Sequence, residues 1–118
     1  MKYMLLIQQG MTPLPGTPEW ERLSEDERSA VHADYQAVNQ TTGVRPGEWL
    51  EPPETATTVR VENGETLTTD GPFVAVKEAL GGYLFYEAAD LDAAIELAAR
   101  IPAARLGGAI EVRPIVEW

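Results

Sequence analysis

The chain has 118 residues and a formal net charge of −10, which comes from 19 acidic and 9 basic side chains. This excess of acids repels phosphate, so we expect neither nucleic acid nor an anionic membrane surface as a partner. The sequence contains no cysteine, which excludes disulfides, thiolate catalysis and the best zinc ligand. We expect one domain over residues 1–118, and we assign it to the cytoplasm by default, because the opening apolar run is too short for a signal peptide.

The first stretch, Lys2 to Gln8, predicts a strand that is buried on both faces, because its apolar residues run consecutively instead of alternating. Residues 10–18 follow with prolines at three positions and predict a loop. Trp20 is expected to anchor this loop to the body of the protein.

The first helix is predicted from about residue 24 to residue 40 and is ended by Gly43. Ser24 and Glu27 have the spacing of a capping box, in which each residue satisfies a backbone N–H of the other. Apolar side chains at helical spacing form the expected buried stripe, with two alanines beside it: Val31, Tyr35 and Val38, then Ala30 and Ala37.

The middle of the chain predicts a short strand over residues 47–51, which Pro52 and Pro53 end. Residues 56–62 are rich in threonine and valine and predict a further strand. Asn63-Gly64 then gives the strongest short signal for a hairpin, and it pairs that strand with residues 65–69.

The last third predicts a strongly apolar strand over residues 82–88 and a second helix from Asp90 to Arg100. Pro102 ends this helix, and a small-residue loop leads to a strand over residues 110–116, where Pro114 suggests a sheet edge. The expected inward stripe of the second helix is Leu91, Ala94, Ile95, Ala98 and Ile101.

The predicted order is β-α-β-hairpin-β-α-β, which indicates an α+β fold: a ferredoxin-like sandwich with an inserted β-hairpin. Two helices cover only one face of such a sheet. Because the central strands are apolar on both faces, the second face needs a cover, and a second copy of the chain is the simplest one. We therefore expect a homodimer with a cavity at or near the interface between the two sheets.

Asp70 lies between the predicted strand 65–69 and the dipeptide Gly71-Pro72. Aspartate can bond its own backbone, glycine accepts unusual dihedrals and proline fixes φ, so this stretch predicts a rigid corner. A carboxylate held there is typical of an ordinary turn and also suits a functional acid. Both interpretations stay open.

His32 is the only histidine in the chain and follows Val31 on the first predicted helix. It is either a half-exposed helix residue or a general acid and base, because imidazole side chains change charge near neutral pH. In the second case it needs a carboxylate to orient it, and Asp70 is the candidate. We name Asp70 and His32 as candidate catalytic residues.

Lys77 is either part of a solvated Lys-Glu pair or a binding group for an anionic part of a ligand. The candidate ligand-binding residues are those of the turn and this lysine: Gly71, Pro72, Phe73 and Lys77. A lone histidine without cysteine predicts no metal site, and no motif indicates a cofactor. The pairs Gly81-Gly82 and Gly107-Gly108 open no predicted helix, so they are not expected to bind phosphate. Aromatic residues such as Trp20 and Trp49 either belong to the core or line an apolar pocket.

Stretches spread over nearly the whole chain share one pattern: residues 1–7, 53–61, 69–73 with 77–78, 81–83, 99–104 and 111–114. In these stretches the chain resembles the DGPF-domain proteins of the YCII-related group. The resemblance implies a dimeric α+β barrel of ferredoxin-like protomers. It also implies a His–Asp active site in a cleft, in which Asp70 matches the motif acid and His32 lies on the corresponding helix.

Two hypotheses on function follow. The first is a small-molecule-binding dimeric barrel with acid and base chemistry centred on Asp70. The second is a regulatory or accessory module without catalysis, because DGPF-domain proteins are often encoded beside sigma factors. A sigma factor is then the expected protein partner, and a net charge of −10 suits a basic protein better than DNA. The sequence does not decide whether the protein is an enzyme.

Overall fold

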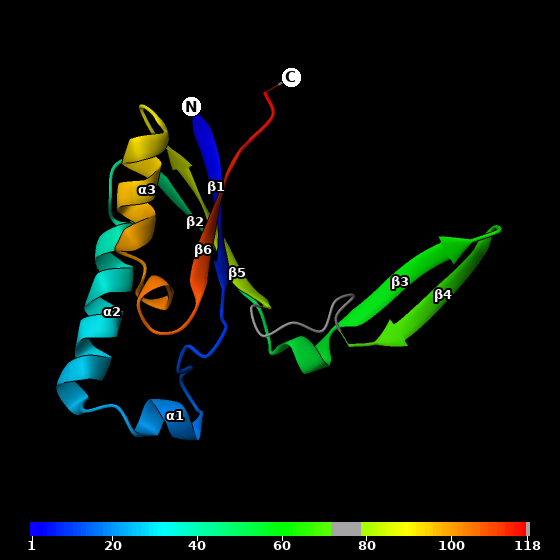
Figure 1. Ribbon diagram of the computed structural model, residues 1–118, viewed down its shortest axis with the longest axis horizontal. Coiled ribbons are helices and arrows are strands. Elements are labelled where there is room, and N and C mark those ends of the chain that lie inside the picture. Colours follow the sequence, from blue (N-terminus) through cyan, green and yellow to red (C-terminus); the bar gives the residue numbers. More distant parts are fainter. Residues whose placement is uncertain (72–78, 118) are drawn as a thin grey trace.

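The computed structural model describes residues 1–71 and 79–117 (Figure 1). The predicted α+β element order is confirmed, with short helical segments in addition. The elements are β1 (Lys2–Gln8), α1 (Pro18–Glu21), α2 (Glu25–Asn39), β2 (Val44–Trp49), the 3-10 helix η1 (Pro53–Thr55), β3 (Thr57–Glu62), β4 (Glu65–Asp70), β5 (Leu80–Glu87), α3 (Leu91–Ala99), the 3-10 helix η2 (Pro102–Ala104) and β6 (Ala109–Pro114).

The main sheet is four-stranded and antiparallel, in the order β2-β5-β1-β6. β1 is central and pairs with β5 through Leu5↔Leu84 and with β6 through Leu5↔Val112. Helices α2 and α3 lie on one side of this sheet (Figure 1). We call the main sheet with α2 and α3 the body. β3 and β4 pair in a separate two-stranded sheet, which we call the hairpin.

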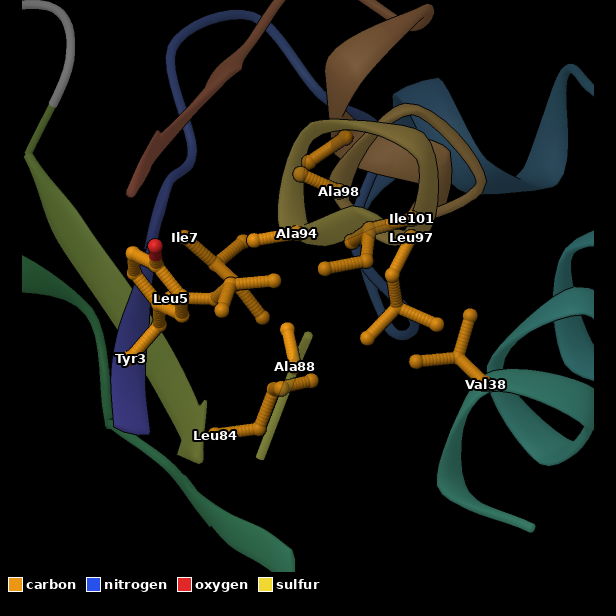
Figure 2. Close-up of a cluster of buried hydrophobic side chains, with 11 residues drawn as sticks. Tyr3, Leu5, Ile7, Val38, Leu84, Ala88, Ala94, Leu97, Ala98 and Ile101 are labelled. Carbon is orange, nitrogen blue, oxygen red and sulfur yellow. The ribbon is translucent and has the colours of Figure 1, made fainter. Parts of the chain in front are cut away.

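The core lies between the main sheet and the helices. Alternate residues of β1 point into it, and Leu5 is 0% exposed. Figure 2 shows these strand side chains facing Ala94, Leu97 and Ile101 from α3 and its end, with Val38 of α2 beside them. Successive side chains of a strand point to opposite faces of the sheet, so every second residue of β1 faces the helices. α2 and α3 cover this side of the core.

Capping explains where the two long helices begin. The predicted capping box is confirmed: Ser24 Oγ accepts from the Glu27 N–H at 3.0 Å, and Glu27 Oε1 accepts from the Ser24 N–H at 2.9 Å. These bonds lower the pKa of Glu27. Asp90 caps α3 by accepting from the Ala93 N–H at 2.9 Å.

The predicted buried stripe of α3 is wrong at two positions. Leu91 and Ile95 are about half exposed, at 49% and 50%, whereas Leu97 is fully buried. The segment Leu91–Ala99 is apolar around most of its circumference, so the hydrophobic period does not define its inward face. On α2, Val31 and Val38 are buried as predicted, and Ala30 and Ala37 are exposed.

Two other segments differ from prediction. The strand expected at 47–51 is β2, Val44–Trp49; it contains Pro46, which an edge strand accepts because one row of its backbone N–H groups needs no partner. The loop expected at 10–18 ends in α1, with Thr17 as its N-cap and Pro18 at its first position. Pro114 lies in β6 at the other sheet edge, as predicted.

The face of the main sheet opposite the helices, which we call the open face, carries partly exposed apolar side chains from the two central strands: Met4, Leu6, Tyr83 and Phe85. The rings of Tyr83 and Phe85 meet edge to face at 5.8 Å, and the Arg45 guanidinium lies 4.4 Å from the Phe85 ring. Among the described residues, no helix covers this face (Figure 1).

The hairpin projects away from the body (Figure 1). Its predicted turn is confirmed, since Asn63 and Gly64 both have positive φ, 52° and 79°, as this type of tight hairpin requires. Val59 and Val61 are 59% and 67% exposed. The chain leaves and re-enters the body at adjacent points, because the Leu50 N–H donates to the Gly81 carbonyl at 2.9 Å.

Candidate functional site

A small cavity of about 60 Å³, which we call the inner cavity, lies between the end of β1, the following loop, α1 and α2. The described lining residues are mostly apolar or aromatic: Gln9, Thr12, Pro13, Leu14, Pro15, Trp20, Val31, His32, Tyr35, Trp49 and Pro102. Concave, mainly apolar sites with a few polar groups are where proteins bind small molecules.

Four rings enclose this cavity in two edge-to-face pairs. The Trp20 and His32 rings lie 5.3 Å apart at 73°, and the Tyr35 and Trp49 rings lie 5.5 Å apart at 66°. His32 and Tyr35 are three residues apart on α2, so they share one face of the helix. Trp20 is only 6% exposed, which agrees with its predicted anchoring role. Of the two alternatives left open for Trp20 and Trp49, core or pocket lining, the structure has both residues in the cavity lining.

Tyr35 is the second titratable residue among the described lining residues, beside His32. Burial raises the pKa of Tyr35, while the positive charge of Arg105 and a backbone hydrogen bond at Ala103 act in the opposite direction. Arg105 is itself paired with Asp34 at 2.5 Å. Tyr35 therefore presents a protonated phenol at neutral pH, which can donate a hydrogen bond.

Two polar side chains in the lining carry buried atoms that bond to nothing else in residues 1–71 and 79–117. These atoms are Gln9 Oε1 and Thr12 Oγ1. A buried polar atom without a partner costs about 1–3 kcal/mol in folding free energy. The lining thus contains hydrogen-bonding capacity that the described part of the fold does not use.

The inner cavity adjoins a wider cleft of about 1140 Å³, the outer cleft, and the two share Gln9, Thr12, Leu14, Pro15 and Trp49. The segment that leads to the hairpin, Leu50 to Glu54, and Ala79 form part of the cleft wall. The charged residues among its described lining are Glu51 and Glu54. Because both of these charged residues are acidic, the described lining favours neutral or cationic groups over anionic ones.

Asp70 is exposed and is the last residue of β4, opposite Thr57 of β3. It is absent from the described linings of both cavities. Gly71 follows with a φ of 95°, and its N–H donates to the Ala56 carbonyl at 2.6 Å. The other candidate ligand-binding residues, Pro72, Phe73 and Lys77, lie outside the described residues.

The structure places His32 at the inner cavity. None of the described interactions joins Asp70 to His32. Helix α2 and the hairpin lie on opposite sides of the main sheet (Figure 1). Three or more His, Asp or Glu side chains do not gather into a metal-binding group within the described ranges. In the same ranges, no helix is long and apolar enough to cross a membrane.

Sequence reasoning missed Gln9, Thr12 and Tyr35 as site residues. The sequence pattern places Tyr35 in the buried stripe of α2, and its three-residue spacing from His32 is the signal that points to a shared site. Gln9 and Thr12 lie directly after β1 and around Gly10, where polar residues are expected in any loop. No sequence feature distinguished them.

The YCII-related domain model matches residues 1–118, the full length of the chain. The chain belongs to the YCII-related family. It is also 36% identical, over 105 residues, to an uncharacterised protein of Rhizobium meliloti (strain 1021), and the match covers 84% of this chain and 82% of that protein. The family expected from the DGPF stretch is thereby confirmed, and this comparison assigns no activity to that relative.

Proposed function

We propose that this YCII-related protein is a small-molecule-binding homodimer in which His32 exchanges a proton with a ligand held in the inner cavity. The observation that carries the proposal is the position of His32 on the cavity wall, with its ring against Trp20 and with Tyr35 three residues along the helix. An imidazole can both accept and donate a proton, and the Tyr35 phenol can donate a hydrogen bond to the reacting group.

Asp70 is the second group that accepts or donates a proton in the proposed mechanism. The hairpin begins three residues after Glu54, which lines the outer cleft, and the Gly71 N–H holds the end of β4 against Ala56. The base of the hairpin is therefore close to the cleft wall along the chain. The proposed binding residues Gly71, Pro72, Phe73 and Lys77 fall between Asp70 and Ala79, and Ala79 lines the cleft.

Support for a homodimer comes from the open face. Apolar side chains of two central strands are partly exposed there, and stacked sheets bury such faces about 10 Å apart. A dimer formed through two open faces would extend the proposed α+β barrel across both copies. A monomer in light scattering at micromolar concentration would contradict this part of the proposal.

The dimer has a direct test. Leu6→Lys places a charge on the open face, and we expect it to convert the dimer to a monomer in light scattering. Ala99→Lys is the matched control, because Ala99 is exposed on α3, on the other side of the sheet. The control should leave the mass of the particle unchanged.

Ligand binding is tested by native mass spectrometry of the purified protein, before and after incubation with metabolite extract from its host. A retained small molecule would support the proposal and would identify a ligand. If a clean dimer retains nothing, the result would favour the second hypothesis, a regulatory or accessory module whose partner is a sigma factor.

Proton exchange is then measured on the retained molecule as deuterium incorporation from D₂O, followed by ¹H NMR. We expect His32→Gln to slow the exchange by about 10²-fold or more, as for the loss of a general acid or base. Asp70→Asn tests the second group in the same assay. Gln36→Ala, an exposed change on α2 outside the described lining, is the control. Unchanged exchange in both His32→Gln and Asp70→Asn would rule out the proposed catalytic roles.

A further inference from the structure

The turn after β1, residues 9–12, is packed against both Gly-Gly pairs of the chain. A Cβ atom built at Gly81 would lie 2.0 Å from Gln9 Nε2, and one built at Gly108 would lie 2.7 Å from Thr12 Oγ1 and 2.3 Å from the Gln8 carbonyl. Side chains at these two positions would collide with the turn. Because glycine has no side chain, Gly81 and Gly108 leave room for the side chains of Gln9 and Thr12.

These same two side chains carry the buried oxygen atoms that have no partner in the described part of the chain, Gln9 Oε1 and Thr12 Oγ1. Both residues line the inner cavity and the outer cleft, so they lie where the two spaces meet. The fold thus places hydrogen-bond acceptors beside a cavity enclosed by aromatic rings. Such an arrangement fits a ligand that supplies the missing donor.

We propose that Gln9 and Thr12 are the polar recognition groups of the site, and that its ligand is a neutral, flat molecule with a hydroxyl or N–H group that donates to Gln9 Oε1. This inference rests on the proposed small-molecule function and adds a ligand class to it. Trp49 and Tyr35 offer ring surfaces for the flat part. Glu51 and Glu54 in the outer cleft disfavour an anionic ligand.

The test compares two probes of nearly equal shape, p-cresol and p-xylene, in which a methyl group replaces the hydroxyl. Binding is followed by ¹H–¹⁵N NMR through the indole N–H signals of Trp20 and Trp49. We expect p-cresol to bind the wild-type protein about ten-fold more tightly than p-xylene, because only the phenol can satisfy Gln9 Oε1.

Two substitutions remove the acceptors without a large change in side-chain volume. Gln9→Met should abolish the preference for p-cresol over p-xylene, and Thr12→Val should reduce that preference. Gly81→Ala displaces the Gln9 side chain by direct steric overlap, and it should also abolish the preference. Leu80→Ala is its control in the same strand, because Leu80 is exposed and lies outside the described linings of both cavities.

Equal binding of both probes to the wild-type protein would overturn the inference and leave the proposed small-molecule function intact. A preference for p-cresol that survives in Gln9→Met would also overturn it. So would a lower unfolding midpoint in Gln9→Met with an unchanged preference, since this is the result of a purely structural role. If neither probe binds, the ligand class is wrong, and retention of a metabolite in mass spectrometry decides separately on the proposed function.

Discussion

The body and the hairpin of this protein are specified by different kinds of interaction. In the body, Leu5 and Leu97 are fully buried, and the helices close one side of the sheet. In the hairpin, Val59 and Val61 remain more than half exposed, and the turn at Asn63-Gly64 sets the geometry. The comparison teaches that turn chemistry is enough to define a shape, whereas stability requires a packed face.

The largest expected difference is in the cost of truncating an apolar side chain. We expect Leu97→Ala to lower the free energy of unfolding by about 2–5 kcal/mol, because it leaves a cavity in a close-packed core. We expect Val61→Ala to change it by less than about 0.5 kcal/mol, because the side chain is exposed. Urea unfolding followed by circular dichroism measures both.

Similar losses in these two variants would break the comparison. They would mean that a second copy of the chain, or another partner, covers the hairpin in solution. The concentration dependence of the Val61→Ala effect would then distinguish a second copy from a different partner.

A medium effect is expected at the start of α2, where a local cap stabilises an element of the body. Ser24→Ala removes the side-chain half of the capping box and should cost about 1 kcal/mol in unfolding free energy. Ser29→Ala is the control, because Ser29 is exposed inside the same helix, where alanine is the better helix former. Equal losses in the two variants would argue against a stabilising cap.

The turn of the hairpin offers a smaller and more local effect. Gly64 has a φ of 79°, where a Cβ atom adds roughly 1 kcal/mol of strain. We expect Gly64→Ala to speed amide hydrogen exchange in β3 and β4 and to leave exchange in β1 and β5 unchanged. Faster exchange in both sheets would show that the hairpin and the body unfold together.

The smallest effect is a pH dependence at the cavity. Because burial raises the pKa of Tyr35 in the folded protein, this residue contributes stability that is complete below about pH 10, its unfolded value, and is lost as the pH rises through the folded pKa. Tyr35→Phe should therefore lose less stability than the wild-type protein between pH 8 and pH 11. Parallel losses in both proteins would contradict this assignment.

Most of the fold could be predicted because its signals are local. The capping box at Ser24, the turn at Asn63-Gly64 and the apolar run of β1 each depend on a few neighbouring residues. The phase of α3 could not be predicted, because a helix that is apolar on most sides has no period that distinguishes Leu91 from Leu97.

The candidate site was predictable only in part. His32 could be named because it is the only histidine, and Trp20 and Trp49 because large aromatic side chains line pockets as well as cores. Gln9 and Thr12 depend on clearance at Gly81 and Gly108, which are distant in sequence. Such a contact leaves no local pattern.

The hydrogen bond from the Leu50 N–H to the Gly81 carbonyl joins the two points at which the hairpin segment leaves and re-enters the body. In evolutionary terms, such closed ends make the intervening segment an exchangeable module. It can lengthen, shorten or change its surface between homologues while the main sheet keeps its register. Divergence among relatives should therefore concentrate at the Asn63-Gly64 turn, which lies outside the stretches that carry the family resemblance, and a chimera that carries a relative's hairpin should keep the body of this protein.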